Sequence, residues 1–235
     1  MSPTARPSGL FITGTDTNVG KTQIATRIVG ELRAKSHRVG VYKPVCSGAS
    51  GESPPQWDDI ERLRAALGLD LPDEIICPQR FLAPLAPHLA ARAEARFVDF
   101  ERLVSGMDWW RGRADLMIVE GAGGLLAPVT DTKTVADLAR AVHYPLVIVA
   151  RCGLGTINHT LLTIEAARNR QLAIAGVVLN QSHPEDNWSL AESNAVEIET
   201  RSGVSVFGFM KYGSDDGLQR HESPVTIRWS DLADG

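Results

Sequence analysis

Residues 10–22 read Leu-Phe-Ile-Thr-Gly-Thr-Asp-Thr-Asn-Val-Gly-Lys-Thr, a short apolar run followed by a turn of small residues and then a lysine. The run predicts a β-strand at Leu10–Thr13, and the amphipathic stretch after it predicts a helix near 20–35. A helix that begins at such a turn offers unpaired backbone N–H groups and the positive end of its dipole. A phosphate requires these groups and a flexible cation, which Lys21 supplies. We therefore predict a phosphate-binding loop at residues 14–22.

The loop departs in one place from the strict Gly-x-x-x-x-Gly-Lys-Ser/Thr spacing. That spacing would put a glycine at Thr15, whereas the chain has its glycine one residue earlier, at Gly14. A tight strand-to-helix turn with an incidental lysine is the alternative, which the strand–turn–helix context disfavours. The hydroxyl of Thr22 is suited to a magnesium ion beside the phosphates. The loop residues assigned to nucleotide binding are Asn18, Val19, Gly20, Lys21 and Thr22.

Short apolar runs alternate with longer amphipathic stretches along the whole chain. This alternation predicts a single-domain α/β fold, with a parallel, doubly wound sheet and helices on both faces. Together with the phosphate loop at residues 14–22, it predicts a P-loop NTPase-like core. Further helices are predicted near 58–67, 98–112, 134–142, 156–170 and 188–202. Residues 213–235 show little periodicity and are expected to form a loosely attached tail of the single domain 1–235. The predicted strands are Leu10–Thr13, Val39–Lys43, Leu116–Glu120, Leu146–Ala150, Ile174–Asn180 and Val204–Phe209.

The composition narrows the class of protein. The 235 residues are 43% hydrophobic and 22% charged, as in ordinary globular proteins, and the formal net charge is −4. This acidic balance argues against a nucleic-acid partner. Three widely spaced cysteines suggest neither a disulfide framework nor a zinc cluster. With no apolar run long enough for a membrane helix and no signal-peptide pattern at the start, we expect a cytoplasmic protein without a membrane partner.

Several predicted strands end in residues suited to ligands, and in open parallel sheets ligands lie beyond the carboxyl ends of the strands. Glu120 ends a strand where its carboxylate reaches a metal, and Gly121 and Gly123 let the backbone approach a bound molecule. Lys43 ends another strand, as an anion ligand or simply as an exposed lysine. Ser47 follows it in a loop.

Asp58 and Asp59 open a predicted helix, where acidic residues commonly serve only to complement the helix dipole. The spacing alone favours that structural role over a metal site.

Taken together, these motifs resemble the dethiobiotin synthetase family from about residue 9 to residue 210. The phosphate loop alone is ambiguous, but the ordered set is specific. The matching stretches are Gly-Thr-Asp-Thr-Asn-Val-Gly-Lys-Thr at 14–22, Tyr-Lys-Pro-Val-Cys-Ser-Gly at 42–48, Ala-Pro-His-Leu-Ala-Ala at 86–91, Val-Glu-Gly-Ala-Gly-Gly-Leu at 119–125, Gly-Leu-Gly-Thr-Ile-Asn-His-Thr-Leu-Leu-Thr at 153–163 and Gly-Val-Val-Leu-Asn at 176–180.

The resemblance implies a homodimeric, Mg²⁺-dependent ligase that makes dethiobiotin from 7,8-diaminononanoate, CO₂ and ATP. It also implies a role for each matching residue. Lys21 would bridge the β- and γ-phosphates, Lys43 would hold the carbamate, and Ser47 would touch the substrate. Asn180 would read the adenine edge. Magnesium would be held by Thr22, Asp59 and Glu120, and the substrate carboxylate by Gly155, Thr156, Ile157 and Asn158 of the partner subunit.

One stretch departs from the family pattern. The family tends to have a proline after the last strand, where this chain has Phe209-Met210-Lys211-Tyr212-Gly213. The contacts to the nucleotide base, and the preference for ATP over other nucleoside triphosphates, therefore stay open.

Two other classes share this kind of core. Amidating synthetases related to the cobyrinic acid amide synthases use a glutaminase, for which the chain shows no placed Cys/His pair. Dimeric ATP switches of the partitioning type carry an additional lysine early in the phosphate loop, and positions 13–19 contain none.

Overall fold

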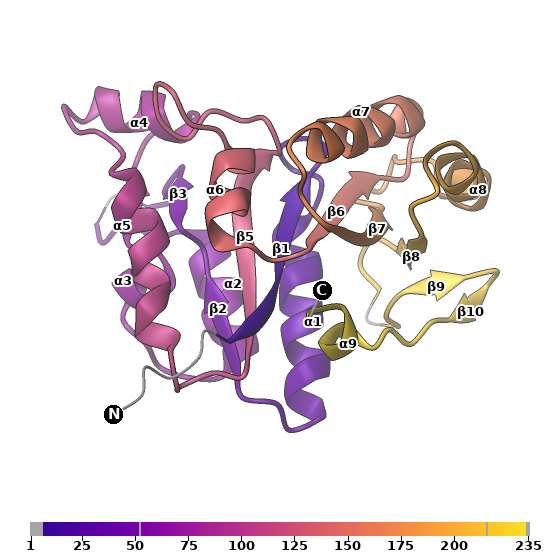
Figure 1. Ribbon diagram of the computed structural model, residues 1–235, viewed down its shortest axis with the longest axis horizontal. Helices are drawn as coiled ribbons and strands as arrows, with labels where there is room; N and C mark the ends of the chain where they lie inside the picture. Colours follow the sequence, from indigo (N-terminus) through magenta and orange to yellow (C-terminus); the bar gives the residue numbers. More distant parts are fainter. Residues whose placement is uncertain (1–6, 52, 215, 234–235) are drawn as a thin grey trace.

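A mostly parallel sheet forms the centre of the computed structural model, which describes residues 7–51, 53–214 and 216–233. Within these residues the strand order is β10-β9-β8-β7-β6-β1-β5-β2, and all neighbours from β8 to β2 run parallel (Figure 1). This is the doubly wound sheet that the sequence predicts. Its parallel strands are β1 (Ser8–Gly14), β2 (Val39–Tyr42), β5 (Leu116–Gly124), β6 (Leu146–Arg151), β7 (Ile174–Asn180) and β8 (Val206–Met210).

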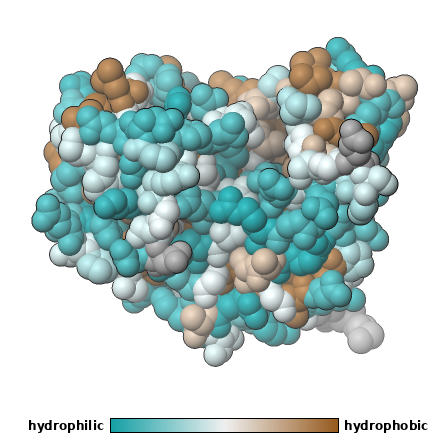
Figure 2. Space-filling view, turned by 180° about the vertical axis from the view of Figure 1, so that it is seen from behind, coloured by the Kyte–Doolittle hydropathy of each residue, from teal (hydrophilic) through white to brown (hydrophobic). Residues whose placement is uncertain are grey.

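Helices cover both faces of this sheet. Helices α1 (Lys21–Ala34) and α2 (Asp58–Leu67) pack together on one face, while α6 (Val135–Val142) and α7 (Thr156–Asn169) lie on the other, with α8 (Ala191–Ser202) beside α7 (Figure 1). Figure 2, which looks onto the side of α1 and α2, is predominantly hydrophilic. The polar sides of these amphipathic helices therefore face solvent and their apolar sides face the sheet.

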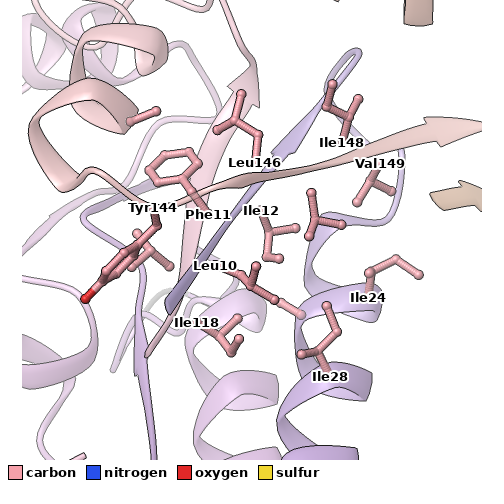
Figure 3. Close-up of a cluster of buried hydrophobic side chains, with 14 of the residues drawn as sticks. Leu10, Phe11, Ile12, Ile24, Ile28, Ile118, Tyr144, Leu146, Ile148 and Val149 are labelled. Atoms are coloured by element: carbon pink, nitrogen blue, oxygen red, sulfur yellow. The ribbon is translucent and has the colours of Figure 1, made fainter. Parts of the chain in front are cut away.

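Strand β1 shows why the central strands are apolar throughout. Alternate residues of a strand point to opposite faces. Leu10 and Ile12 point towards Ile24 and Ile28 of α1, whereas Phe11 lies on the side of Tyr144 (Figure 3). Because both faces are buried, a period-two pattern of polar residues is not possible here.

The predicted elements match the structure where the apolar runs are long. All six predicted strands are present, and the helix expected near 98–112 is divided into α5 (Phe100–Ser105) and a 3₁₀ helix (Gly106–Trp110). The structure also contains elements that were not predicted: the parallel pair β3 (Val45–Ser47) and β4 (Gln79–Phe81), and the short helices α3 (Asp73–Ile76) and α4 (Pro87–Ala93). Elements of three to seven residues are too short to show a period.

The C-terminal segment differs from the loosely attached tail expected from the sequence. Strands β9 (Gln219–Arg220) and β10 (Ser223–Pro224) extend the sheet, and α9 (Trp229–Ala233) packs on β1 and α1. Trp229 is 1% exposed, and its Nε1 donates to Glu31 Oε2 at 2.8 Å. One buried tryptophan thus anchors a stretch with no visible periodicity.

None of the helices in the described ranges is long and apolar enough to cross a bilayer.

Candidate active site

The phosphate loop joins β1 to α1 and is shaped by Gly20. Gly20 caps α1 with φ of 91°, and no side chain caps the helix. A Cβ at this position would lie 2.0 Å from Asn180 Nδ2, so both the backbone angle and the space require glycine. The first N–H groups of α1 are therefore left for an anion, with the helix dipole behind them.

Lys21 lies against this loop with 7% of its surface exposed. Its Nζ donates to the carbonyl of Asp16 at 3.1 Å. Burial and the neighbouring Lys43 lower the pKa of Lys21 to about 8. A bound polyphosphate would oppose this effect, because its negative charge favours the protonated form of Lys21.

Lys43 and two carboxylates form a buried cluster at the end of the loop. Lys43 Nζ lies 2.5 Å from Asp59 Oδ2 and 2.5 Å from Glu120 Oε1. The Thr22 hydroxyl lies 2.6 Å from Asp59 Oδ1 and 2.9 Å from Glu120 Oε1, and it has one proton for two acceptors. Two residues from neighbouring strands, Lys43 after β2 and Glu120 in β5, thus meet two residues from the starts of α1 and α2 within hydrogen-bonding distance.

The charges in this cluster are set by burial and by each other. Burial opposes the charge on Lys43, but Glu120 and Asp59 outweigh it and raise the pKa of Lys43, which stays protonated. Burial and the nearby Asp59 raise the pKa of Glu120. Burial raises the pKa of Asp59, but Lys43 and the hydrogen bond from Thr22 outweigh it, so that the pKa of Asp59 is lowered.

The structure separates the two neighbouring aspartates. Asp59 faces the cluster, whereas the Asp58 carboxylate is exposed and accepts a hydrogen bond from Ser50 at 3.2 Å. Of the two aspartates, therefore, only Asp59 lies in the cluster, next to the oxygen atoms of Thr22 and Glu120 that could also bind a metal ion.

The carboxylate and hydroxyl oxygens fit a magnesium ion. Asp59, Glu120 and Thr22 supply hard oxygen atoms, the ligands that Mg²⁺ prefers. Glu120 Oε2 is buried and has no hydrogen-bond partner within the described residues. A buried carboxylate oxygen with no partner is unfavourable, so a cation would satisfy it.

These groups line a cleft of about 370 Å³, at the edge where the parallel strands end. Its walls carry the phosphate loop on one side and the Lys43 cluster on the other. The lining residues are Thr17, Asn18, Gly20, Lys21, Thr22, Gln23, Lys43, Val45, Cys46, Ser47, Asp59, Arg62, Glu120, Ala122, Gly123 and Ser182.

Comparison with known proteins decides the family. Residues 8–215 match a family model described as an AAA domain. The chain is 50% identical over 190 residues to the ATP-dependent dethiobiotin synthetase BioD of Anaeromyxobacter dehalogenans strain 2CP-C, covering 81% of this chain and 83% of that protein. It is 39% identical over 205 residues to the protein of that name from Bacillus thuringiensis strain Al Hakam, covering 87% and 84%. The chain belongs to the dethiobiotin synthetase family.

Solved structures of other proteins share the fold of this family member. The MinC:MinD cell division protein complex of Aquifex aeolicus aligns with a TM-score of 0.50 at 16% identity, over 96% of this chain and 85% of that chain. The signal recognition particle receptor FtsY of Elizabethkingia anophelis, in complex with GDP, aligns with a TM-score of 0.51 at 14% identity, over 98% and 64%. At such identities only the architecture is shared. The predicted resemblance to dethiobiotin synthetases is confirmed by the curated relatives, which favours this family over the amidating synthetases and the partitioning-type ATP switches.

Asn180 lies under the loop rather than openly in the cleft. Its Nδ2 donates to the carbonyl of Val19 at 3.0 Å and to Gln23 Oε1 at 3.3 Å. The Asn180 side chain is fully buried, and its Oδ1 has no partner among the described residues. This leaves one buried acceptor of Asn180 without a hydrogen bond under the loop.

Two residues predicted to bind the nucleotide, Gly121 and Val19, do not line the cleft. A Cβ at Gly121 would lie 2.9 Å from Val135 Cγ1, so glycine is needed to pack α6 against the sheet. Val19 points into the core, and only its backbone faces the loop. The glycine that does line the cleft is Gly123, with φ of 68°.

The residues expected to hold the substrate are distributed over two places. Ser47 lines the phosphate cleft, and its hydroxyl donates to the carbonyl of Leu85 at 2.6 Å. Thr156 lines a separate hollow of about 280 Å³ at the start of α7. The Thr156 hydroxyl is buried without a partner in the described structure, and α7 has no side-chain cap. Ile157 packs partly against the core and Asn158 is exposed.

Among the lining residues to which the sequence assigned no role are Gln23, Cys46, Arg62 and Ser182. Two of them had a signal. Gln23 directly follows the phosphate loop, and Arg62 lies one helical turn after Asp59, so both lie on helix surfaces already assigned to the site. Ser182 had none, because it follows β7 in an irregular segment. Cys46 was within the matched stretch 42–48, but burial raises its pKa to about 11, so its thiol is inert.

Proposed function

We propose that this chain is an ATP- and Mg²⁺-dependent ligase that closes the ureido ring of dethiobiotin from 7,8-diaminononanoate and CO₂, releasing ADP and phosphate. The observation that carries the proposal is the buried Lys43–Glu120–Asp59 cluster next to Lys21. It puts a protonated lysine, ion-paired with two carboxylates, beside a phosphate loop. The name of the relatives, ATP-dependent dethiobiotin synthetase, supports ATP as a substrate and dethiobiotin as the product.

The chemistry needs positioning and charge stabilisation more than acid–base groups. One amine of the substrate takes up CO₂ as a carbamate, whose oxygen attacks the γ-phosphorus and expels ADP. The second amine attacks the carbonyl carbon of the carbamic-phosphoric anhydride, and phosphate leaves. Lys43 would hold the carbamate and Lys21 the β- and γ-phosphates, so that both anions are brought together against their repulsion.

Magnesium would be held by Thr22, Asp59 and Glu120, and when bound it would neutralise phosphate charge. The ammonium of Lys43, which is ion-paired with both carboxylates in this structure, would turn towards the carbamate. Asn180 Oδ1 would accept from the amino group of adenine, a donor that guanine lacks at that position.

The substrate site would be completed by a second copy of the chain. The helix start at Gly155, Thr156, Ile157 and Asn158 lies outside the phosphate cleft, which favours its use by the partner subunit. Leu154, next to it, is 97% exposed, as expected of a residue covered on dimerisation. The unpaired N–H groups of α7 and the Thr156 hydroxyl would bind the substrate carboxylate.

The test is product analysis. The purified protein is incubated with 7,8-diaminononanoate, ¹³C-bicarbonate, ATP and Mg²⁺, and we expect labelled dethiobiotin and ADP in equal amounts. A control omits the diamine. ATP hydrolysis without a labelled product would contradict the proposed reaction, and an amidated product requiring ammonia would point to the rival synthetase class.

A further inference from the structure

Arg62 lies where the phosphate cleft meets a second hollow. It is exposed on α2, one turn after Asp59, and so lies on the same side of the helix. Both Arg62 and Gln23 line the phosphate cleft and also an outer hollow of about 340 Å³. The outer hollow is lined by Gln23, Thr26, Arg27, Arg62, Met210, Gly213 and Ser214.

The Arg62 guanidinium has no hydrogen bond or ion pair with any residue in the described ranges. Its neighbour Arg64, two positions along α2, differs in this respect. Arg64 is held by Glu61, by Asp73 and by the carbonyl of Leu71. Arg64 therefore serves the fold, whereas Arg62 keeps all its donors for another molecule.

The charges of the cleft leave a role for this guanidinium. Lys21 and Lys43 contribute two positive charges, and Asp59 and Glu120 carry two carboxylates, so these four groups together supply no excess of cation. A nucleoside triphosphate brings several negative charges. Arg62 is the remaining Lys or Arg that lines the cleft in the described structure. Guanidinium groups bind phosphate oxygens in bidentate geometry.

The position along the nucleotide follows from the two ends of the cleft. Lys21 and Lys43 mark the inner end, where the transferred phosphoryl group belongs. In the proposed function, Asn180, which contacts Gln23, lies on the base side. Arg62 borders both hollows together with Gln23, and therefore faces the middle of an extended nucleotide.

We propose that Arg62 is a nucleotide-binding residue that holds the α-phosphate from the side opposite the phosphate loop. The inference rests on the proposed use of ATP in this cleft. ATP and ADP share an α-phosphate and differ only at the inner end, so Arg62 contributes equally to the binding of both.

The test compares Arg62→Ala and Arg62→Lys with Arg201→Ala. Arg201 is an exposed arginine on α8, away from the cleft and ion-paired only with Glu197 in the described residues, so its removal controls for loss of one helical surface charge. Affinities for ATP and ADP are measured by calorimetry, and KM and kcat by dethiobiotin formation. We expect Arg62→Ala to weaken both nucleotides by the same factor, about tenfold to a hundredfold. KM for ATP should rise equally, with kcat at saturating ATP unchanged. Arg62→Lys should lose less, since it keeps the charge.

Two results would overturn the assignment. Affinities unchanged relative to Arg201→Ala would show that Arg62 does not touch the nucleotide, and weakened ATP with unchanged ADP would place it at the γ-phosphate. If the wild-type protein itself bound neither nucleotide, the proposed function would fail, so the two failures are distinguishable. Arg62→Lys keeps the comparison valid should the alanine variant fail to fold.

Discussion

Replacing Lys43 by methionine removes the charge of the buried cluster while keeping most of the side-chain volume. Lys43 and Glu120 have 4% and 1% of their side chains exposed, so Glu120 would be left buried beside a thioether. Breaking a buried pair in this way costs about 3–5 kcal/mol. Asp59 is 36% exposed, is reached by solvent, and is not counted in this figure. For a chain of this length the loss corresponds to a decrease of about 6–20 °C in Tm.

A second substitution separates stability from catalysis. Glu120→Gln in the Lys43→Met background removes the stranded charge, so we expect most of the lost stability to return. Dethiobiotin formation should stay absent in both variants, because neither holds the carbamate. Glu120→Gln alone is the matched control for the loss of the carboxylate.

The pH dependence of Lys43→Met gives an independent check. Without its cation, the buried Glu120 has a pKa raised above that in the unfolded chain, so folding takes up a proton. Stability then falls as pH rises from the unfolded pKa, near 4.5, to the raised folded value, and the deficit against wild type shrinks towards acid pH. Urea unfolding between pH 5 and pH 8 measures it. A Lys43→Met protein as stable as wild type at pH 8, or no recovery in the double variant, would refute the cluster's energetics.

Three further outcomes are expected. Asp59→Ala should raise the magnesium concentration needed for half-maximal turnover by about tenfold, whereas Asp58→Ala should leave it unchanged; the reverse would mean that the exposed aspartate is the ligand. Mixing the inactive variants Lys21→Ala and Gly155→Trp should restore part of the activity through hybrid dimers, and no recovery after proven subunit exchange would confine the site to one chain. Trp229→Ala should destabilise the fold by about 3–5 kcal/mol in urea titration; a change below 1 kcal/mol would mean that the C-terminal helix is not part of the folded core.

The sequence predicted those parts of the fold that depend on long apolar runs and on a local turn. The strand at Leu10–Thr13 and the helix after it follow from the pattern and from the glycine at the turn. Pairings between distant short segments, such as β3 with β4, depend on tertiary packing and leave no local period. The C-terminal segment escaped prediction for the same reason, because it is attached by contacts with distant parts of the chain, among them those of Trp229.

The site was predictable where a charged side chain lies near the carboxyl end of a predicted strand. Lys43 directly follows β2, as predicted, whereas Glu120 lies within β5, which continues to Gly124. Their direct contact joins residues 77 positions apart and could not be read from either neighbourhood. Gly121 is a residue for which the sequence pattern predicted ligand binding but the structure shows a packing position. Its position in a glycine-rich strand end suggests a ligand, whereas the space around it is filled by Val135 and Phe11.

The pairing of Lys43 with carboxylates stabilises a buried cation that the proposed reaction requires. A cleft that must bring a carbamate and a triphosphate together needs cations, yet an unpaired buried ammonium would be costly before the ligands arrive. Glu120 and Asp59 neutralise Lys43 in the free protein. Since a buried ion pair is near break-even in free energy, exchanging these two carboxylate partners for a carbamate costs little. The same two carboxylates, released from Lys43, are then the oxygens that a magnesium ion requires. Binding of metal and of carbamate should therefore be mutually favourable, and magnesium affinity measured with and without the diamine and bicarbonate should increase in their presence in wild type but not in Lys43→Met.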